Sequence, residues 1–228
     1  AVFLLVFGML ALALFEKKQT PRNPKSSMLH LGVFGFAVVL PYLMVVLVAM
    51  LTGSFDRFWH WTVAYAGQYA SVKTYDRAMA NLSAGFQVLS IGVQPFWYAG
   101  VAGIAALFFS EAARRHRRNI ALFAFFSALC VLPGFYFRSH YFIVFFPALS
   151  LLVGIAIHYL HEVGLRRAGA LVGFLPFVLF AALFFYGLNR HQAVLFQESP
   201  EKISLRMYGR GNPFQESVEI GKYIRANS

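Results

Sequence analysis

An arginine and a histidine two positions apart, Arg138 and His140, have the most unusual chemical setting in this sequence, because aromatic residues enclose them between two apolar runs. An ionisable side chain at the edge of such a run is costly to desolvate and usually has a partner. The planar guanidinium of arginine fits a phosphate, and histidine exchanges a proton near neutral pH. With the adjacent Tyr141, the pair predicts a phosphate or pyrophosphate site. The residue types leave one alternative open, in which Arg138 extends into lipid headgroups and His140 is an interfacial residue.

A second group of interest is aromatic, and its members Trp61, Tyr65 and Tyr69 recur at four-residue spacing after the aromatic and charged stretch 55–60. Residues four apart lie on one face of a helix, and Lys73 would extend that face by one step. The face predicts an aromatic floor beneath a lipid-linked or sugar substrate. An interfacial helix lying on the membrane is the alternative, because Trp and Tyr favour the headgroup level. The two interpretations are compatible.

The elements that must position these residues are apolar helices. Hydrophobic residues make up 59 % of the chain and charged residues 13 %, against about 45–50 % and about 25 % in soluble domains. A hydrocarbon core of about 30 Å is crossed by roughly 20 apolar residues in a helix. The sequence therefore predicts an all-α transmembrane fold, a multi-span bundle of about six helices with amphipathic helices at the outer face. The expected spans are 1–15, 31–51, 95–110, 119–132, 141–160 and 168–188.

The ends of the sequence suggest that it is a fragment. The first apolar run is too short for a full span and has no initiator methionine, so we interpret it as the second half of a helix. We expect residues 1–188 to be the C-terminal part of a larger transmembrane bundle whose N-terminal half is missing. Residues 189–228 are expected to form a tail outside the cytoplasm, the start of a truncated C-terminal domain. In this tail the sequence predicts a turn at 209–213 and an amphipathic helix over 214–225.

The basic residues are distributed as in a membrane protein. The net charge is +11, and the basic clusters at 17–25, 114–118 and 166–167 fall in alternate loops between the expected spans. The positive-inside rule therefore places these loops together in the cytoplasm, with the loops 52–94 and 133–140 on the outer side. A basic chain of this kind favours the lipid bilayer and an anionic lipid as partners, and we expect no nucleic-acid partner.

Other chemical signals are weak or absent. The sequence has no phosphate-binding loop, dinucleotide fingerprint or zinc-protease motif, so no cofactor is identifiable. His158 and His161 lack a third ligand and are expected to be interfacial histidines, with no metal. Asp56 and Asp76 are expected to be interfacial or helix-capping residues. The single cysteine, Cys130, excludes an internal disulfide and is expected to be a buried hydrophobe.

Three segments resemble bacterial membrane glycosyltransferases of the GT-C superfamily, the relatives of dolichyl-phosphate-mannose-protein mannosyltransferase and of the lipid A aminoarabinose transferase. The stretch 138–142, followed by Pro147, is similar to a segment that opens a late transmembrane helix in these proteins. The stretch 58–69 resembles their outer aromatic loop. The stretch 212–224 resembles the beginning of a small C-terminal outer domain. The matches occur in the family's order and span residues 55–228.

The resemblance implies an enzyme of the bacterial plasma (inner) membrane. Such an enzyme moves a sugar from a polyprenyl-phosphate-linked donor to a glycan, lipid or protein acceptor at the outer face. The catalytic carboxylate of the family lies in the first outer loop, within the missing half, so no catalytic residue is assigned here. A divalent metal would likewise bind through that half. The implied substrate-binding residues are Arg138, His140 and Tyr141 toward the donor phosphate, with Trp61, Tyr65 and Tyr69 as the aromatic floor.

Two other functions stay open. A multi-span transporter or flippase of lipid-linked sugars would also be basic and aromatic, but it needs polar groups along a path through the bilayer. Here the expected polar groups gather at one face, which favours surface chemistry. A non-catalytic membrane scaffold is the third interpretation.

Overall fold

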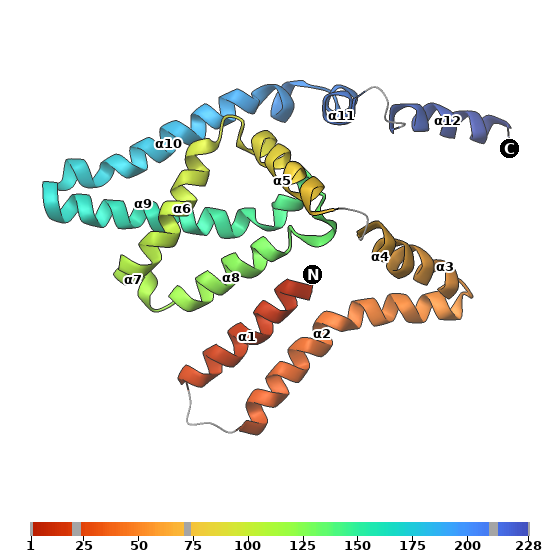
Figure 1. Cartoon of the computed structure of the whole chain (residues 1–228), viewed down its shortest axis with the longest axis horizontal. Helices are drawn as coiled ribbons and strands as arrows, with labels where there is room; N and C mark the ends of the chain where they lie inside the picture. The colour runs from red at the N-terminus through yellow and green to blue at the C-terminus, as the bar shows by residue number, and fades with distance from the viewer. Residues whose placement is uncertain (1, 20–23, 71–73, 210–213, 228) are drawn as a thin grey trace. The chain divides into compact units, whose positions relative to one another are not determined.

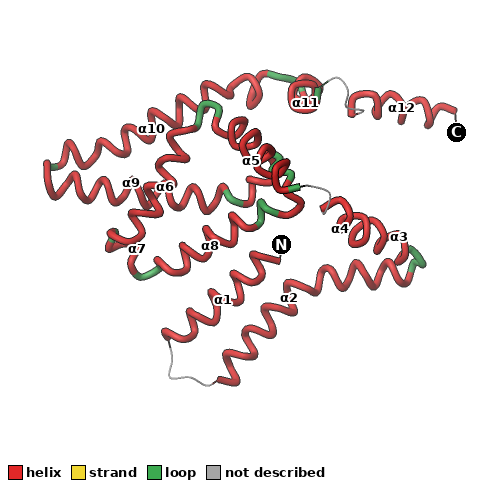
Figure 2. Tube along the Cα trace, viewed as in Figure 1, coloured by secondary structure: helices red, strands yellow, loops and turns green. Residues whose placement is uncertain are grey.

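The computed structural model describes residues 2–19, 24–70, 74–209 and 214–227, and all regular secondary structure in these ranges is helical (Figures 1 and 2). The predicted all-α class is confirmed. The α-helices are α1 (Val2–Gln19), α2 (Pro24–Leu51), α3 (Phe55–Trp59), α4 (Tyr65–Ala70), α5 (Tyr75–Ser90), α6 (Gln94–Phe109), α7 (Glu111–Arg114), α8 (Arg117–Leu129), α9 (Phe146–Ala168), α10 (Ala170–Gln192), α11 (Pro200–Tyr208) and α12 (Phe214–Asn227). Two π-helical turns, η1 (His60–Ala64) and η4 (Ala193–Gln197), and two 3₁₀ turns, η2 (Pro133–Phe135) and η3 (Ser139–Val144), complete the set.

Three helical segments are long and apolar enough to cross a membrane, judged by length and composition: Met28–Leu51, Phe146–Ala168 and Ala170–Gln197. Only 6 % of the most apolar window of the first is buried, so its apolar surface needs a lipid environment. These segments indicate a membrane protein. The α5–α6 pair would be a fourth span if it is counted as one, although it bends by 109°.

The predicted six-span bundle is not confirmed. The expected spans 95–110 and 119–132 form α6 and α8, which have 16 and 13 residues. At about 1.5 Å per residue these helices reach only about 24 Å and about 20 Å, short of a core of about 30 Å. The apolar part of α1 is also short, covering Phe3–Ala13.

Prolines account for several helix boundaries and bends. Pro41 lies inside α2, which changes direction along its length in Figure 1, because proline removes one backbone hydrogen bond and its ring clashes with the preceding turn. Pro147 lies in the first turn of α9, where its missing N–H is no loss. The expected span 141–160 therefore begins later than predicted, and η3 occupies its start.

The closest helix packing joins α6 to α9, which cross in Figure 1. Gly100 and Gly103 of α6 are buried at this crossing, and a Cβ atom on Gly103 would collide with the backbone carbonyl of Leu152. Small residues allow two backbones to approach closely, which is a frequent basis of helix association in membranes. Leu152 is 1 % exposed and, with Leu107 and Ala113, forms one apolar core.

A second apolar core connects α5 to the segment 131–145. Its buried members are Ala78, Val131, Phe137 and Phe142, and Trp97 of α6 packs against them. This core attaches an irregular loop to a regular helix.

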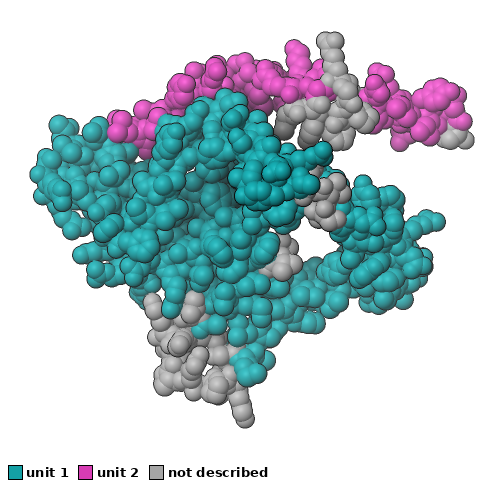
Figure 3. All heavy atoms as spheres, in the orientation of Figure 1, with its two compact units in different colours: residues 1–177 teal, residues 178–228 magenta. Residues whose placement is uncertain are grey.

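The chain divides into two compact units, residues 1–177 and 178–228, drawn in two colours in Figure 3. The division falls within α10, and the domain boundary predicted after residue 188 stays a prediction. In the second unit, the Ser199 hydroxyl caps the N-terminus of α11, and Arg206 pairs with Glu198 at 2.6 Å. The amphipathic helix predicted over 214–225 corresponds to α12, and the predicted turn lies largely outside the described residues.

Candidate functional site

The predicted aromatic face exists and continues beyond the residues that predicted it. The rings of Trp61 and Tyr65 lie 5.3 Å apart edge to face, and those of Tyr65 and Tyr69 lie 6.4 Å apart in a stacked arrangement. Tyr69 then stacks on Tyr136, with ring centroids 4.4 Å apart and planes within 7°. We call the four residues Trp61, Tyr65, Tyr69 and Tyr136 the aromatic ladder. The next position of the predicted face, Lys73, lies outside the described residues.

Arg138 extends the ladder by one member of a different kind. Its guanidinium carbon lies 5.5 Å from the centroid of the Tyr136 ring, within the distance of about 6 Å at which a cation is attracted to a ring face. Four of the six sequence-predicted site residues are therefore connected by a chain of ring contacts. Tyr136 is not among the residues predicted from the sequence, since no local spacing pairs it with Tyr69, which is 67 positions away.

The loop that carries Tyr136 has a strained backbone. Phe135 and Phe137 have φ angles of 53° and 46°, in the left-handed region that side chains disfavour. Such residues cost about 1–3 kcal/mol each and persist where surrounding contacts impose them. Those contacts are visible here: the Asn81 amide donates to the Phe135 carbonyl at 3.1 Å, and Gly85 leaves room for the Phe137 carbonyl.

The Tyr136 phenol is itself constrained. It donates a hydrogen bond to the backbone oxygen of Tyr69 at 3.2 Å. Partial burial is the largest effect that raises the pKa of this phenol above 10.0, and the side-chain hydrogen bond and the charge of Tyr69 act in the same direction. The Arg138 cation acts in the opposite direction. Tyr136 is therefore a neutral hydrogen-bonding group at physiological pH.

The two remaining predicted residues are not members of the ladder, although the charge of Tyr141 contributes to the raised pKa of Tyr136. His140 is exposed and contacts Tyr141 edge to face, with ring centroids 4.8 Å apart. Tyr141 is partly buried against the core around Phe142. Within the described residues, no hydrogen bond or ring contact joins His140 to Arg138 or to the ladder. The predicted pair is therefore divided in the structure, because Arg138 contacts the ladder and His140 contacts Tyr141.

Carboxylates take the helix-terminal positions that the sequence predicts. Asp56 and Asp76 lie in the first turns of α3 and α5, where a negative charge is favoured by the helix dipole. Among the described residues, no group of three histidine, cysteine or acidic side chains is placed to hold a metal ion. The titratable side chain that contacts the ladder ring of Trp61 is His60, which lies edge to face with it at 5.1 Å between ring centroids.

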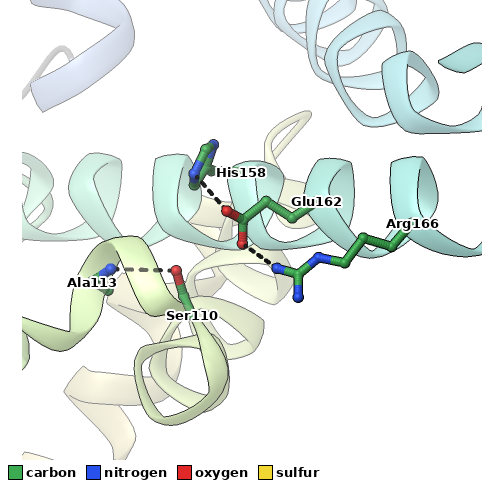
Figure 4. A network of polar contacts seen from close by, with 5 residues as sticks. All are labelled: Ser110, Ala113, His158, Glu162 and Arg166. Carbon is green, nitrogen blue, oxygen red and sulfur yellow. Dashed lines mark hydrogen bonds and ion pairs between the residues drawn. The ribbon is translucent and has the colours of Figure 1, made fainter.

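The two histidines of α9 have structural contacts. His158 Nε2 lies 3.5 Å from the Glu162 carboxylate, which also faces Arg166 at 3.3 Å, as Figure 4 shows beside the capping contact of Ser110 with Ala113. The His161 ring bonds to the Gly173 carbonyl at 2.7 Å.

A small cavity at the bend between α5 and α6 was not predicted. Its volume is about 240 Å³, and Phe86, Gln87, Ser90, Gln94, Trp97 and Tyr98 line it. The Ser90 hydroxyl is buried there without a hydrogen-bond partner in the described part of the chain. Amides, a hydroxyl and aromatic rings around a small space are groups that suit a polar ligand.

Comparisons of the chain with protein-family models, with characterised proteins and with solved structures give no match.

Proposed function

We propose that this chain is part of an integral membrane glycosyltransferase of the GT-C kind, which moves a sugar from a polyprenyl-phosphate-linked donor to an acceptor at the outer face of the membrane. The observation that carries the proposal is the connection of Arg138 to the aromatic ladder through Tyr136. An arginine cation at the end of a row of aromatic faces suits a ligand with a phosphate next to an apolar or sugar part. Membrane-spanning helices in the same chain suit a lipid-linked donor.

In this proposal Arg138 binds the donor phosphate. The phosphate gains negative charge as the glycosidic bond breaks, so a cation aimed at it stabilises the transition state more than the ground state. The strained loop keeps the arginine in place before the substrate arrives. The ladder supplies stacking surface in this proposal, and His140 and Tyr141 are assigned as further donors to the phosphate, although within the described residues no hydrogen bond or ring contact joins His140 to Arg138. No catalytic carboxylate and no metal ligand of this chain are assigned in the proposal.

Binding of a polyprenyl phosphate to the chain in detergent micelles tests the proposal. We expect Arg138→Ala to weaken binding about tenfold or more, since a charge-assisted bidentate bond is lost. Arg138→Lys should restore it only in part, because lysine lacks the planar fork. Arg57→Ala is the matched control, since it removes one exposed arginine from α3 without touching the ladder. Equal binding by all four proteins would remove the phosphate role.

A transporter or flippase of lipid-linked sugars is the second candidate, and one observation favours it. The α5–α6 pair bends by 109° around a cavity with a buried, unpartnered hydroxyl. Broken helices of this kind line substrate sites in many transporters. Vesicles that contain the chain and a fluorescent polyprenyl-phosphate sugar separate the two functions. Movement of the lipid between leaflets that Ser90→Ala or Gln94→Ala abolishes would favour the transporter.

A further inference from the structure

A second candidate site lies between α6 and α8, away from the ladder. It is a groove of about 620 Å³, within the range of about 300–1,000 Å³ that ligand pockets occupy. Its lining is apolar except for two adjacent arginines, Arg117 and Arg118, at the first residues of α8. The apolar lining comes mainly from α6 and α8, with Phe145 and Leu152 completing it.

Small side chains on α8 create the space. Ala121, Ala124 and Ala128 are spaced three and four residues apart, so they share one helix face, and none of them fills the groove. The floor is firm, because Leu107 is 3 % and Leu152 1 % exposed, and both belong to the core where α6 crosses α9. The groove is therefore apolar along α8 and has a well-packed floor.

The arginines give one end of the groove a strong positive charge. The Arg117 guanidinium lies 5.8 Å from the centroid of the Phe108 ring, at the border of the apolar lining. Within the described residues, neither Arg117 nor Arg118 pairs with a carboxylate. The first turn of α8 also lacks an acidic residue, so two cations lie at the positive end of a helix dipole. An anion bound there would relieve this repulsion.

We propose that the groove binds one anionic phospholipid, with an acyl chain along the alanine face of α8 and the headgroup phosphate at Arg117 and Arg118. Basic pockets between membrane helices are suited to anionic headgroups. The site is distinct from the donor site proposed at Arg138. Arg117 begins α8 and the loop of Arg138 follows its end, so about 20 Å of helix separates them.

The first test needs no variant. The chain in neutral detergent is titrated with phosphatidylglycerol and with phosphatidylcholine of the same acyl chains, and bound lipid is counted by native mass spectrometry. We expect one phosphatidylglycerol to bind at least tenfold more tightly than phosphatidylcholine. Equal affinity would overturn the proposal and would indicate that a neutral chain or a partner helix fills the groove.

Variants then separate the groove from general surface charge. The double variant Arg117→Gln, Arg118→Gln should lower phosphatidylglycerol affinity roughly 30-fold, since each arginine near an anionic headgroup contributes about fivefold. The control Arg166→Gln, Arg167→Gln removes the same charge at the end of α9 and should change the affinity less than threefold. Ala121→Trp keeps both arginines and blocks the groove, so it should lower binding at least tenfold. Unchanged binding by Ala121→Trp would show that the lipid binds the surface only, and would overturn the groove assignment.

Discussion

The loop 133–138 and the groove between α6 and α8 both present arginine beside apolar rings, but different forces hold them. Contacts with other segments of the chain hold the loop: one amide hydrogen bond from Asn81, the space at Gly85 and the stack on Tyr69 keep its strained backbone in place. The packing of regular helices holds the groove, because α8 carries its arginines and the close crossing of α6 and α9 forms its floor. A site of the first kind depends on a few single contacts, and a site of the second kind depends on a whole interface.

The largest expected effect follows from breaking that interface. Gly103→Leu would force a side chain against the backbone carbonyl of Leu152, which cannot move without shifting α9. We expect a loss of about 3 kcal/mol in stability, or failure to fold, since overpacking a tight contact is costly. Thermal unfolding in detergent measures it. Gly35→Leu on α2 is the control, because nothing lies within 4 Å of a Cβ there. Equal unfolding of the two variants would refute the close crossing of α6 and α9.

A smaller effect is expected from disturbing the loop. Gly85→Ala would bring a methyl group into the Phe137 carbonyl, with a cost of about 1–3 kcal/mol. The strained loop can respond by moving, so this variant should also weaken polyprenyl phosphate binding in the way that Arg138→Ala does. The groove should be unaffected, and phosphatidylglycerol binding should stay the same. The control is Gly67→Ala on α4, which meets nothing within 4 Å.

If Gly85→Ala lowers the affinity for both ligands equally, the two regions are not independent. It would then be wrong that single contacts hold the loop while helix packing holds the groove.

The sequence predicted what depends on neighbours along the chain. The apolar runs of α2 and α10 and the amphipathic pattern of α12 lie close to where they were expected, and the four-residue spacing of Trp61, Tyr65 and Tyr69 correctly placed their rings side by side. The apolar run of α9 was also predicted, but the helix begins later than expected. The sequence did not predict the contacts that depend on three-dimensional packing. Tyr136 meets Tyr69 across 67 positions, and residues from α6, α8 and α9 line the groove together. The six spans expected from apolar content are not confirmed, because α6 and α8 taken singly are shorter than a hydrocarbon core.

The smallest expected effect concerns titration of Tyr136, which reports the loop directly. Its pKa is raised in the folded chain, chiefly by partial burial and by Tyr69, so the neutral phenol is the favoured form. The resulting contribution to stability is complete below the unfolded pKa of about 10 and is lost as the pH rises through the higher folded value. Because the ring is only partly buried, the stability change is small, and the phenolate absorbance is the better readout.

Arg138→Gln should raise the pKa of Tyr136 further, because it removes the one charge that lowers it. Tyr136→Phe identifies the signal by deleting it, and Arg57→Gln controls for general charge. Gly85→Ala should have the opposite effect on the phenol, since a displaced loop exposes the ring to water and releases the bond to Tyr69. A Tyr136 that titrates at the ordinary tyrosine pKa in the unsubstituted chain would mean that the loop is not held by its contacts. The contrast between the loop and the groove would then be supported only by the helix packing around the groove.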